Sequence, residues 1–65
     1  MQEIINVGKK VNGLEVQYER STMILNEDFT YSELIDLRIN ALDLLDHPER
    51  YMLDIYNHRI IEKIP

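Results

Sequence analysis

The sequence predicts an α+β fold in which an N-terminal antiparallel β-hairpin packs on two α-helices. Three observations predict it: an Asn-Gly pair between two apolar–polar alternating segments, a helix-start signal at Thr30, and a proline at position 48. The chain has 65 residues, of which 45% are hydrophobic and 29% charged. This composition is typical of a globular protein, and the length predicts one small domain over residues 1–65.

The hairpin is predicted over residues 3–20, with its turn at Asn12-Gly13. Both turn residues tolerate positive φ, which a two-residue type I′ turn requires. The residues after the turn alternate between apolar and polar, as in a strand with one wet face. This turn sets the register, in which the expected cross-strand pairs are Val11 with Leu14, Val7 with Tyr18 and Lys10 with Glu15.

A first helix is predicted over residues 31–45. Thr30 and Glu33 have the Thr-x-x-Glu spacing of a capping box, in which each side chain bonds the other residue's backbone N–H. Phe29 and Leu34 occupy the flanking positions of a hydrophobic staple.

A second helix is predicted over residues 48–57, because proline suits a first helical position. Residues 22–25 are interpreted as a third strand after a bend. Residues 60–64 are interpreted as a closing strand, with a helix that continues through Glu62 as the alternative. The expected core draws on apolar residues of all these segments: Ile5, Val7, Val11, Leu14, Val16, Tyr18, Ile24, Phe29, Leu34, Leu37, Ala41, Leu44, Leu45, Met52 and Ile55.

The apolar face of the first predicted helix is unusually broad. It spans roughly 220°, whereas about 100° suffices for a helix that rests on one layer. A hairpin and one short helix hardly cover such an arc, so we expect a homodimer, with a compact monomer as the alternative. The interface candidates are Arg38, Ile35, Ile39, Leu42, Tyr51 and Tyr56.

Arg38 interrupts this apolar arc, and its position has two interpretations. Its aliphatic stem can lie on the edge of the core with the charged end in water. Alternatively, it pairs with a carboxylate such as Glu15 or Glu19, or with an acid of another chain.

The sequence offers little catalytic or metal-binding chemistry, so we predict a protein that is not an enzyme and holds no cofactor or metal. The chain has no cysteine, which excludes a thiolate nucleophile and a Cys-based zinc site. Asp43/His47 and Asp54/His58 have a spacing that places two ligands on one helical face, but two ligands are too few for a tight site.

The charge is concentrated in one part of the chain. The segment from Asn26 to Asp54 carries eight acids and two bases, and the whole chain has a net charge of −5. This balance argues against ordinary binding to a phosphate backbone and favours a basic partner. The acidic face expected to bind that partner consists of Glu33, Asp36, Asp43, Glu49 and Asp54.

We therefore expect a non-enzymatic, homodimeric regulator or inhibitor that binds a basic surface of another protein. The simpler interpretation of the acids is a solvated face that keeps the protein soluble. A DNA-binding regulator of the ribbon-helix-helix kind is the alternative function, suggested by a strand followed by two helices over residues 22–59. No apolar run approaches the roughly 20 residues that cross a bilayer, so the protein is expected to be soluble and cytoplasmic.

Overall fold

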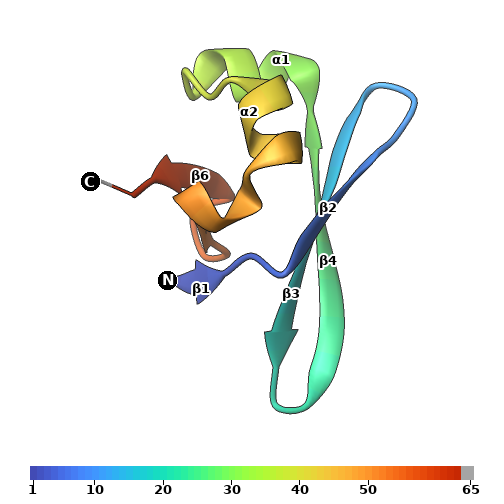
Figure 1. Cartoon of the computed structure of the whole chain (residues 1–65), viewed down its shortest axis with the longest axis vertical. Coiled ribbons are helices and arrows are strands. Elements are labelled where there is room, and N and C mark those ends of the chain that lie inside the picture. Colours follow the sequence, from blue (N-terminus) through green and yellow to red (C-terminus); the bar gives the residue numbers. More distant parts are fainter. Residues whose placement is uncertain (64–65) are drawn as a thin grey trace.

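The structure, a computed structural model, describes residues 1–63 and consists mainly of β-strands (Figure 1). Two antiparallel sheets of three strands each are accompanied by two short helices, so the predicted hairpin packed on two α-helices is wrong. The elements in chain order are β1 (Gln2–Glu3), β2 (Asn6–Lys9), β3 (Gly13–Arg20), β4 (Met23–Thr30), α1 (Tyr31–Asp36), α2 (Ala41–Asp46), the 3-10 helix η1 (Pro48–Arg50), β5 (Tyr51–Asp54) and β6 (Arg59–Glu62).

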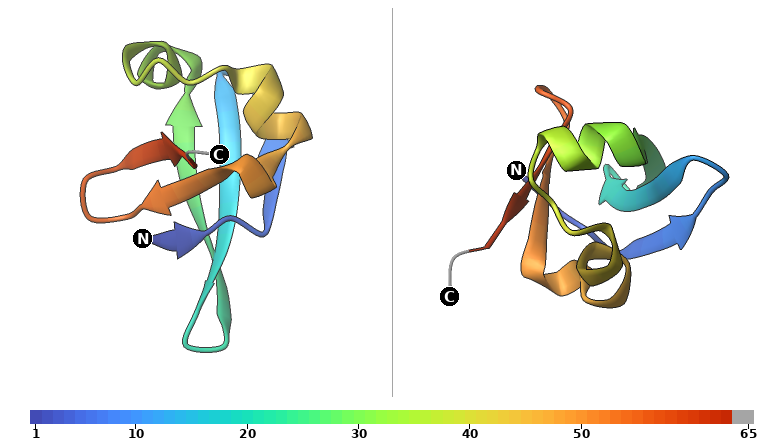
Figure 2. Two further views of the ribbon diagram at one scale, coloured as in Figure 1. Left: turned by 60° about the vertical axis from the view of Figure 1, so that its left-hand side comes forward. Right: turned by 90° about the horizontal axis from the view of Figure 1, so that it is seen from above.

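The N-terminal segment takes part in both sheets, whose strand orders are β1-β5-β6 and β2-β3-β4. The chain passes from one sheet to the other at Ile4 and Ile5, where Ile4 turns inward and is buried while Ile5 is exposed. Figure 2 shows the β5–β6 hairpin crossing the face of the second sheet. The predicted hairpin over residues 3–20 therefore begins later than expected, at Asn6.

The core lies between the two sheets and is closed at one end by the helices (Figure 1). Its residues come from both sheets, from both helices and from the connection at Ile4. Of the residues predicted to be buried, Ile5, Val11 and Ile24 are exposed instead. The buried hydrophobic residues are Ile4, Val7, Leu14, Val16, Tyr18, Phe29, Leu34, Leu44, Tyr51, Leu53 and Ile60.

The first hairpin forms, but with a register two residues away from the predicted one. Lys9 pairs with Leu14 and Val7 with Val16, so the loop is centred on Val11 and Asn12, and Val11 is 94% exposed. A shift of two residues keeps each side chain on its predicted face, which is why Val7 is still buried. Lys10 still reaches Glu15, with Nζ 3.9 Å from Oε2.

Gly13 explains the shift, because it is needed for a close approach and not for a turn. A Cβ at this position would lie 1.9 Å from the carbonyl oxygen of Phe29. Gly13 is paired with Thr30 across β4 and accepts a hydrogen bond from the backbone of Lys10 on its other side. Its φ is not positive.

The conformation predicted for Asn12-Gly13 occurs instead between β3 and β4. Arg20 pairs with Met23, and the two residues between them, Ser21 and Thr22, have φ of 53° and 65°. Positive φ at both central residues is the requirement of a type I′ turn, which matches the twist of the flanking strands. The strand predicted at 22–25 accordingly begins at Met23 and continues to Thr30.

The predicted helix over 31–45 is divided into α1 and α2. The capping box at its start is confirmed: Glu33 N–H donates to Thr30 Oγ1 at 3.1 Å, and Thr30 N–H donates to Glu33 Oε1 at 2.8 Å. The division occurs at Arg38, whose φ is 61°. Its N–H donates to the carbonyl of Ile35, and the N–H of Ile39 donates to that of Leu34, which is the bonding pattern of a Schellman motif.

The helix predicted over 48–57 is also wrong. Pro48 begins only the short η1, and Tyr51–Asp54 is the strand β5. Its buried residues, Tyr51 and Leu53, alternate with partly exposed ones, which is the period of a strand and not of a helix. The closing strand is confirmed in part as β6, while Ile64 lies outside the described residues.

These corrections remove two structural arguments made from the sequence. A ribbon-helix-helix arrangement needs a second helix where β5 lies, so the fold that suggested DNA binding does not form in the described part of the chain. The broad apolar arc belonged to one helix, and the arc does not exist when that helix is divided.

No helix within residues 1–63 is long and apolar enough to span a membrane.

We predict that Gly13→Ala strongly destabilises the fold, because the new methyl group collides with the β4 backbone. The expected loss in the free energy of unfolding, measured by urea denaturation, is about 3 kcal/mol. Gly8→Ala is the matched control, because a Cβ there meets nothing within 4 Å. We expect Gly8→Ala to change stability by less than about 1 kcal/mol. Equal effects of the two substitutions would contradict this explanation of Gly13.

Candidate functional site

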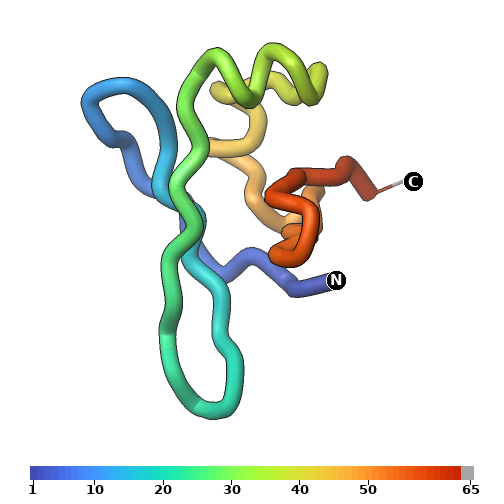
Figure 3. Tube along the Cα trace, turned by 180° about the vertical axis from the view of Figure 1, so that it is seen from behind, coloured from blue at the N-terminus to red at the C-terminus, as the bar shows by residue number. Residues whose placement is uncertain are grey.

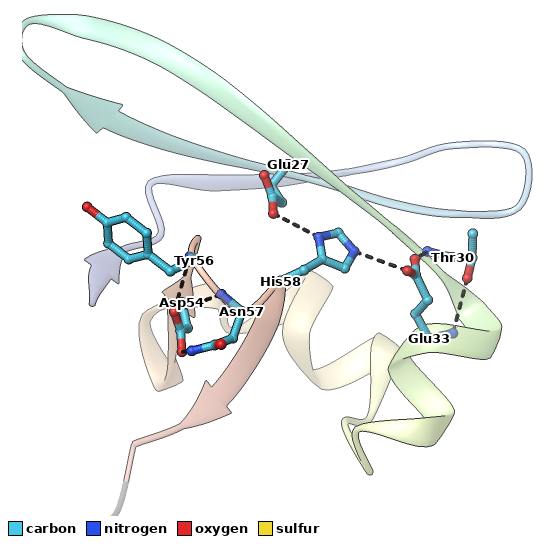
Figure 4. A network of polar contacts seen from close by, with 7 residues as sticks. All are labelled: Glu27, Thr30, Glu33, Asp54, Tyr56, Asn57 and His58. Carbon is cyan, nitrogen blue, oxygen red and sulfur yellow. Dashed lines mark hydrogen bonds and ion pairs between the residues drawn. The ribbon is translucent and has the colours of Figure 1, made fainter.

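His58 lies at the centre of a polar network that joins the β5–β6 turn to β4 and α1, which are distant from it in the sequence (Figure 4). It is the last residue of the turn between β5 and β6 and has a φ of 52°. Asp54 holds this turn: its Oδ1 accepts from the backbone N–H of Tyr56 at 3.2 Å, and its Oδ2 accepts from Asn57 Nδ2 at 2.9 Å. These bonds fix the direction in which His58 leaves the turn.

The imidazole of His58 bridges two carboxylates. Nδ1 is 2.8 Å from Oε2 of Glu27 on β4, and Nε2 is 3.1 Å from Oε2 of Glu33 on α1. The ring also stacks on Phe29, with centroids 4.1 Å apart and an angle of 13° between the planes. The β5–β6 turn is therefore attached to β4 and α1 by two polar contacts and one aromatic contact. We call Glu27, Phe29, Glu33 and His58 the histidine bridge.

The histidine bridge uses both ring nitrogens of His58. Each ring nitrogen faces a carboxylate oxygen, so a proton on either nitrogen is directed to an acceptor within the chain. In this arrangement both ring nitrogens are occupied by partners within the chain. The geometry is that of a structural clamp between layers. It differs from a catalytic histidine, which keeps one nitrogen for the reacting group.

Glu33 has two roles in this network. Its carboxylate accepts from the backbone N–H of Thr30 and also faces His58. The hydrogen bond from Thr30 is the largest influence and, with the nearby His58, lowers the pKa of Glu33 below its usual value of 4.5. Both effects favour the charged carboxylate, because a hydrogen bond to an anion and a neighbouring cation stabilise the ionised form.

A second network fixes the start of β5. Asp43 accepts from Arg50 Nη1 at 3.0 Å and from the hydroxyl of Tyr51. Burial, followed by the hydrogen bond to Asp43, raises the pKa of the Tyr51 hydroxyl well above its usual value. Asp43 therefore serves as an internal acceptor that joins α2 to η1 and β5.

The structure divides the predicted acidic face into two groups. Glu33, Asp43 and Asp54 point to partners within the chain, as described above. Asp36 is exposed at the end of α1, and Glu49 is exposed in η1, where its Oε2 is 3.3 Å from His47 Nδ1. The five acids do not form one continuous binding face.

The interface candidates are likewise divided. Tyr51 is buried, and Ile39 is partly buried against the core. Ile35 and Leu42 are exposed by 73% and 69%, on α1 and α2. Arg38 is exposed in the connection between these helices. Tyr56 is 81% exposed, and the guanidinium of Arg20 lies 6.0 Å from its ring centroid.

The two Asp-x-x-x-His pairs are not paired ligands in the structure. Asp54 and His58 point to different partners, as Figure 4 shows. Asp43 bonds Arg50 while His47 faces Glu49. Within residues 1–63, no group of three or more metal-binding side chains is gathered.

Sequence reasoning missed the bridge between His58 and Glu27, which are 31 positions apart. One signal was present. Glu27 lies between Leu25 and Phe29 in the strand alternation, so its side chain points to the inner face of the sheet. An acid on an inner face requires a partner, and a histidine is a suitable one.

A shallow hollow of about 240 Å³ lies beside the first hairpin loop. It is lined by residues 10–14 and by residues 28–30 of β4. Lys10 lies at this hollow and binds Asp28, with Nζ 2.9 Å from Oδ2.

Comparison with protein-family models, with curated proteins and with solved structures finds no significant match.

We predict that His58→Asn destabilises the fold, although asparagine also tolerates positive φ. The shorter amide neither spans the two carboxylates nor covers Phe29. Because the bridge is partly exposed, solvent screens its charges, and we expect a loss of about 1 kcal/mol in urea denaturation. His47→Asn is the control, since His47 faces a single exposed carboxylate. An unchanged stability of His58→Asn would contradict the role of the bridge.

The lowered pKa of Glu33 predicts a dependence of stability on pH. Between pH 4.5 and the lower pKa of the folded state, the unfolded chain binds more protons at this site, so stability rises with pH. The contribution of Glu33 is complete above about pH 4.5 and is lost as the pH falls through the folded pKa. Glu33→Gln keeps the capping geometry without the charge, and thermal melts should show a shallower decline below pH 4.5. Glu62→Gln, on β6, controls for the general loss of one acid, and a decline as steep as wild type in Glu33→Gln would contradict this assignment.

Proposed function

We propose that the protein is a non-enzymatic interaction module that binds a basic surface of another protein through α1 and α2. The observation that carries this proposal is the character of the two helix ends. Each helix ends on an exposed aspartate, Asp36 and Asp46, and neither has a base in its last turn. We call Ile35, Asp36, Leu42 and Asp46 the helical surface.

Local stability does not account for these aspartates. The C-terminal end of a helix carries partial negative charge, so an acid there is unfavourable and a base is favourable. Basic groups of a partner would neutralise Asp36 and Asp46. Exposed Ile35 and Leu42 lie on the same helices, and their burial against that partner would supply apolar contact.

The chemistry of the remaining side chains supports a binding role more than a catalytic one. Both ring nitrogens of His58 face carboxylates, and the other histidine faces Glu49. The chain has no cysteine. A regulator or inhibitor that occupies a basic surface of its target is the form of function that suits this distribution of groups.

The homodimer remains a second proposal with a narrower basis. Its support is now the exposure of Ile35 and Leu42 instead of a continuous apolar arc. Sedimentation of the purified chain over a range of concentrations measures the oligomeric mass directly.

The proposal predicts that Asp36→Lys combined with Asp46→Lys weakens capture of the partner from a lysate of the native host by about tenfold, because attraction becomes repulsion. The control is Glu3→Lys combined with Glu62→Lys, which changes the net charge by the same amount on strands β1 and β6 instead of on the helices. Both variants should keep the circular dichroism of the wild type. If the two variants capture the partner equally well, the helical surface is not the binding site.

A further inference from the structure

β4 has an open side along its whole length. It pairs with β3 over eight residues, from Met23 to Thr30, and no other described strand pairs with it. The other edge strands are β1, with two residues, and β2 and β6, with four each, so β4 is the longest edge in residues 1–63. Figure 3 shows the β3–β4 hairpin extending well beyond the rest of the chain.

The register identifies the backbone groups on this open side. The two-residue turn makes Arg20 and Met23 a hydrogen-bonded pair. Tyr31 N–H also bonds the carbonyl of Asn12, and Tyr31 is an even number of residues from Met23, so every second residue of β4 from Met23 bonds β3. In an antiparallel ladder such pairs alternate with pairs whose N–H and C=O groups point outward. Ile24, Asn26 and Asp28 therefore direct their backbone groups away from β3. No described residue supplies a backbone partner to these groups.

Proteins protect long edges with charged side chains, inward-pointing charges, proline, bulges or very short strands. β4 has only part of this protection: Glu27 is its inward-pointing charge and is held by His58, and Asp28 is its exposed charge. Residues 23–30 contain neither proline nor lysine, and their pairing with β3 is continuous. Ile24 is 55% exposed on this strand.

Charge decides which kind of strand suits the edge. The β3–β4 hairpin carries four carboxylates and one arginine. A second copy of the chain would bring the same excess of negative charge to the edge, and this general repulsion opposes self-pairing. A basic segment is complementary, and Asp28 is available to it because its side chain is 58% exposed although it binds Lys10.

We propose that the outer edge of β4 is a strand-addition site for an extended, basic segment of a partner protein. The segment pairs antiparallel with β4 and forms main-chain hydrogen bonds with Ile24, Asn26 and Asp28. A basic residue lies opposite Asp28, and an apolar residue four positions later lies opposite Ile24. This mode of recognition draws affinity from the main chain and specificity from alternate side chains.

The hollow beside the first hairpin loop is not part of this site, because its walls are residues 28–30 of β4 and residues 10–14, which lie on the β3 side of β4. The strand-addition site is distinct from the helical surface and goes beyond the function proposed above.

The test uses a synthetic peptide with one lysine, a valine four positions later and threonine at the other positions as the probe, with binding measured by fluorescence anisotropy at low salt. Asn26→Pro removes an outward N–H from the centre of the edge and leaves the ladder with β3 intact. We expect this variant to bind the peptide at least about tenfold more weakly than wild type. Asn26→Ala keeps the N–H and should bind within about twofold of wild type.

Two further arms make the result independent of the folding of Asn26→Pro. A peptide N-methylated at alternate residues loses its own main-chain donors and should bind as weakly as the proline variant does. Asp36→Lys combined with Asp46→Lys should leave peptide binding unchanged, which separates this site from the helical surface.

Three outcomes overturn the proposal. One is that the wild-type chain does not bind the peptide. Another is that the N-methylated peptide binds as tightly as the unmodified one, because the contact is then electrostatic only. The third is a wild-type dimer that dissociates on Asn26→Pro substitution, because the occupant of the edge is then a second copy.

Discussion

The contact of His58 with Phe29, Glu27 and Glu33 is the interaction on which the arrangement of the two sheets depends. A chain of this size buries only about 60% of the surface that its unfolded form exposes, so its core alone gives marginal stability. Phe29 is 1% exposed partly because the imidazole covers it. The histidine bridge therefore completes the apolar core and ties the β5–β6 turn to β4 and α1.

Local signals in the sequence were reliable where few residues settle the outcome. The capping box of Thr30 and Glu33 forms as predicted, because its hydrogen bonds lie within four consecutive residues. The Asn12-Gly13 pair misled because glycine has two uses. Here Gly13 allows the β4 backbone to come close. The type I′ turn is made by Ser21 and Thr22, which are not among the residue types that usually form this turn.

The helices were mispredicted because tertiary packing overrides periodicity over short lengths. Arg38 adopts positive φ, so α1 and α2 point in different directions and no longer share one apolar face. A signal for the second start was present in Asn40, whose side chain accepts from the N–H of Asp43. For β5, the inward positions Tyr51 and Leu53 fit a strand, but Tyr51, Met52, Ile55 and Tyr56 also fit one face of a helix.

The candidate surfaces could be predicted only in part, because the partners of a charged side chain are set by the fold. The sequence identified an excess of acids, but not that Glu33, Asp43 and Asp54 are used within the chain while Asp36 stays exposed. Spacing along the chain carries no information on a contact such as that of His58 with Glu27.

Alternate residues of β4 have different roles: one set directs its side chains to the core, and the other directs its backbone N–H and C=O groups to the open edge. Glu27 and Phe29 turn inward to His58, which holds the strand against the rest of the fold. Ile24, Asn26 and Asp28 turn their backbone groups outward, where the described residues offer no strand. An added strand would use only the outward set, so it could bind without disturbing the histidine bridge. The histidine bridge thus holds β4 in an extended conformation before any partner binds, which lowers the conformational entropy lost on binding.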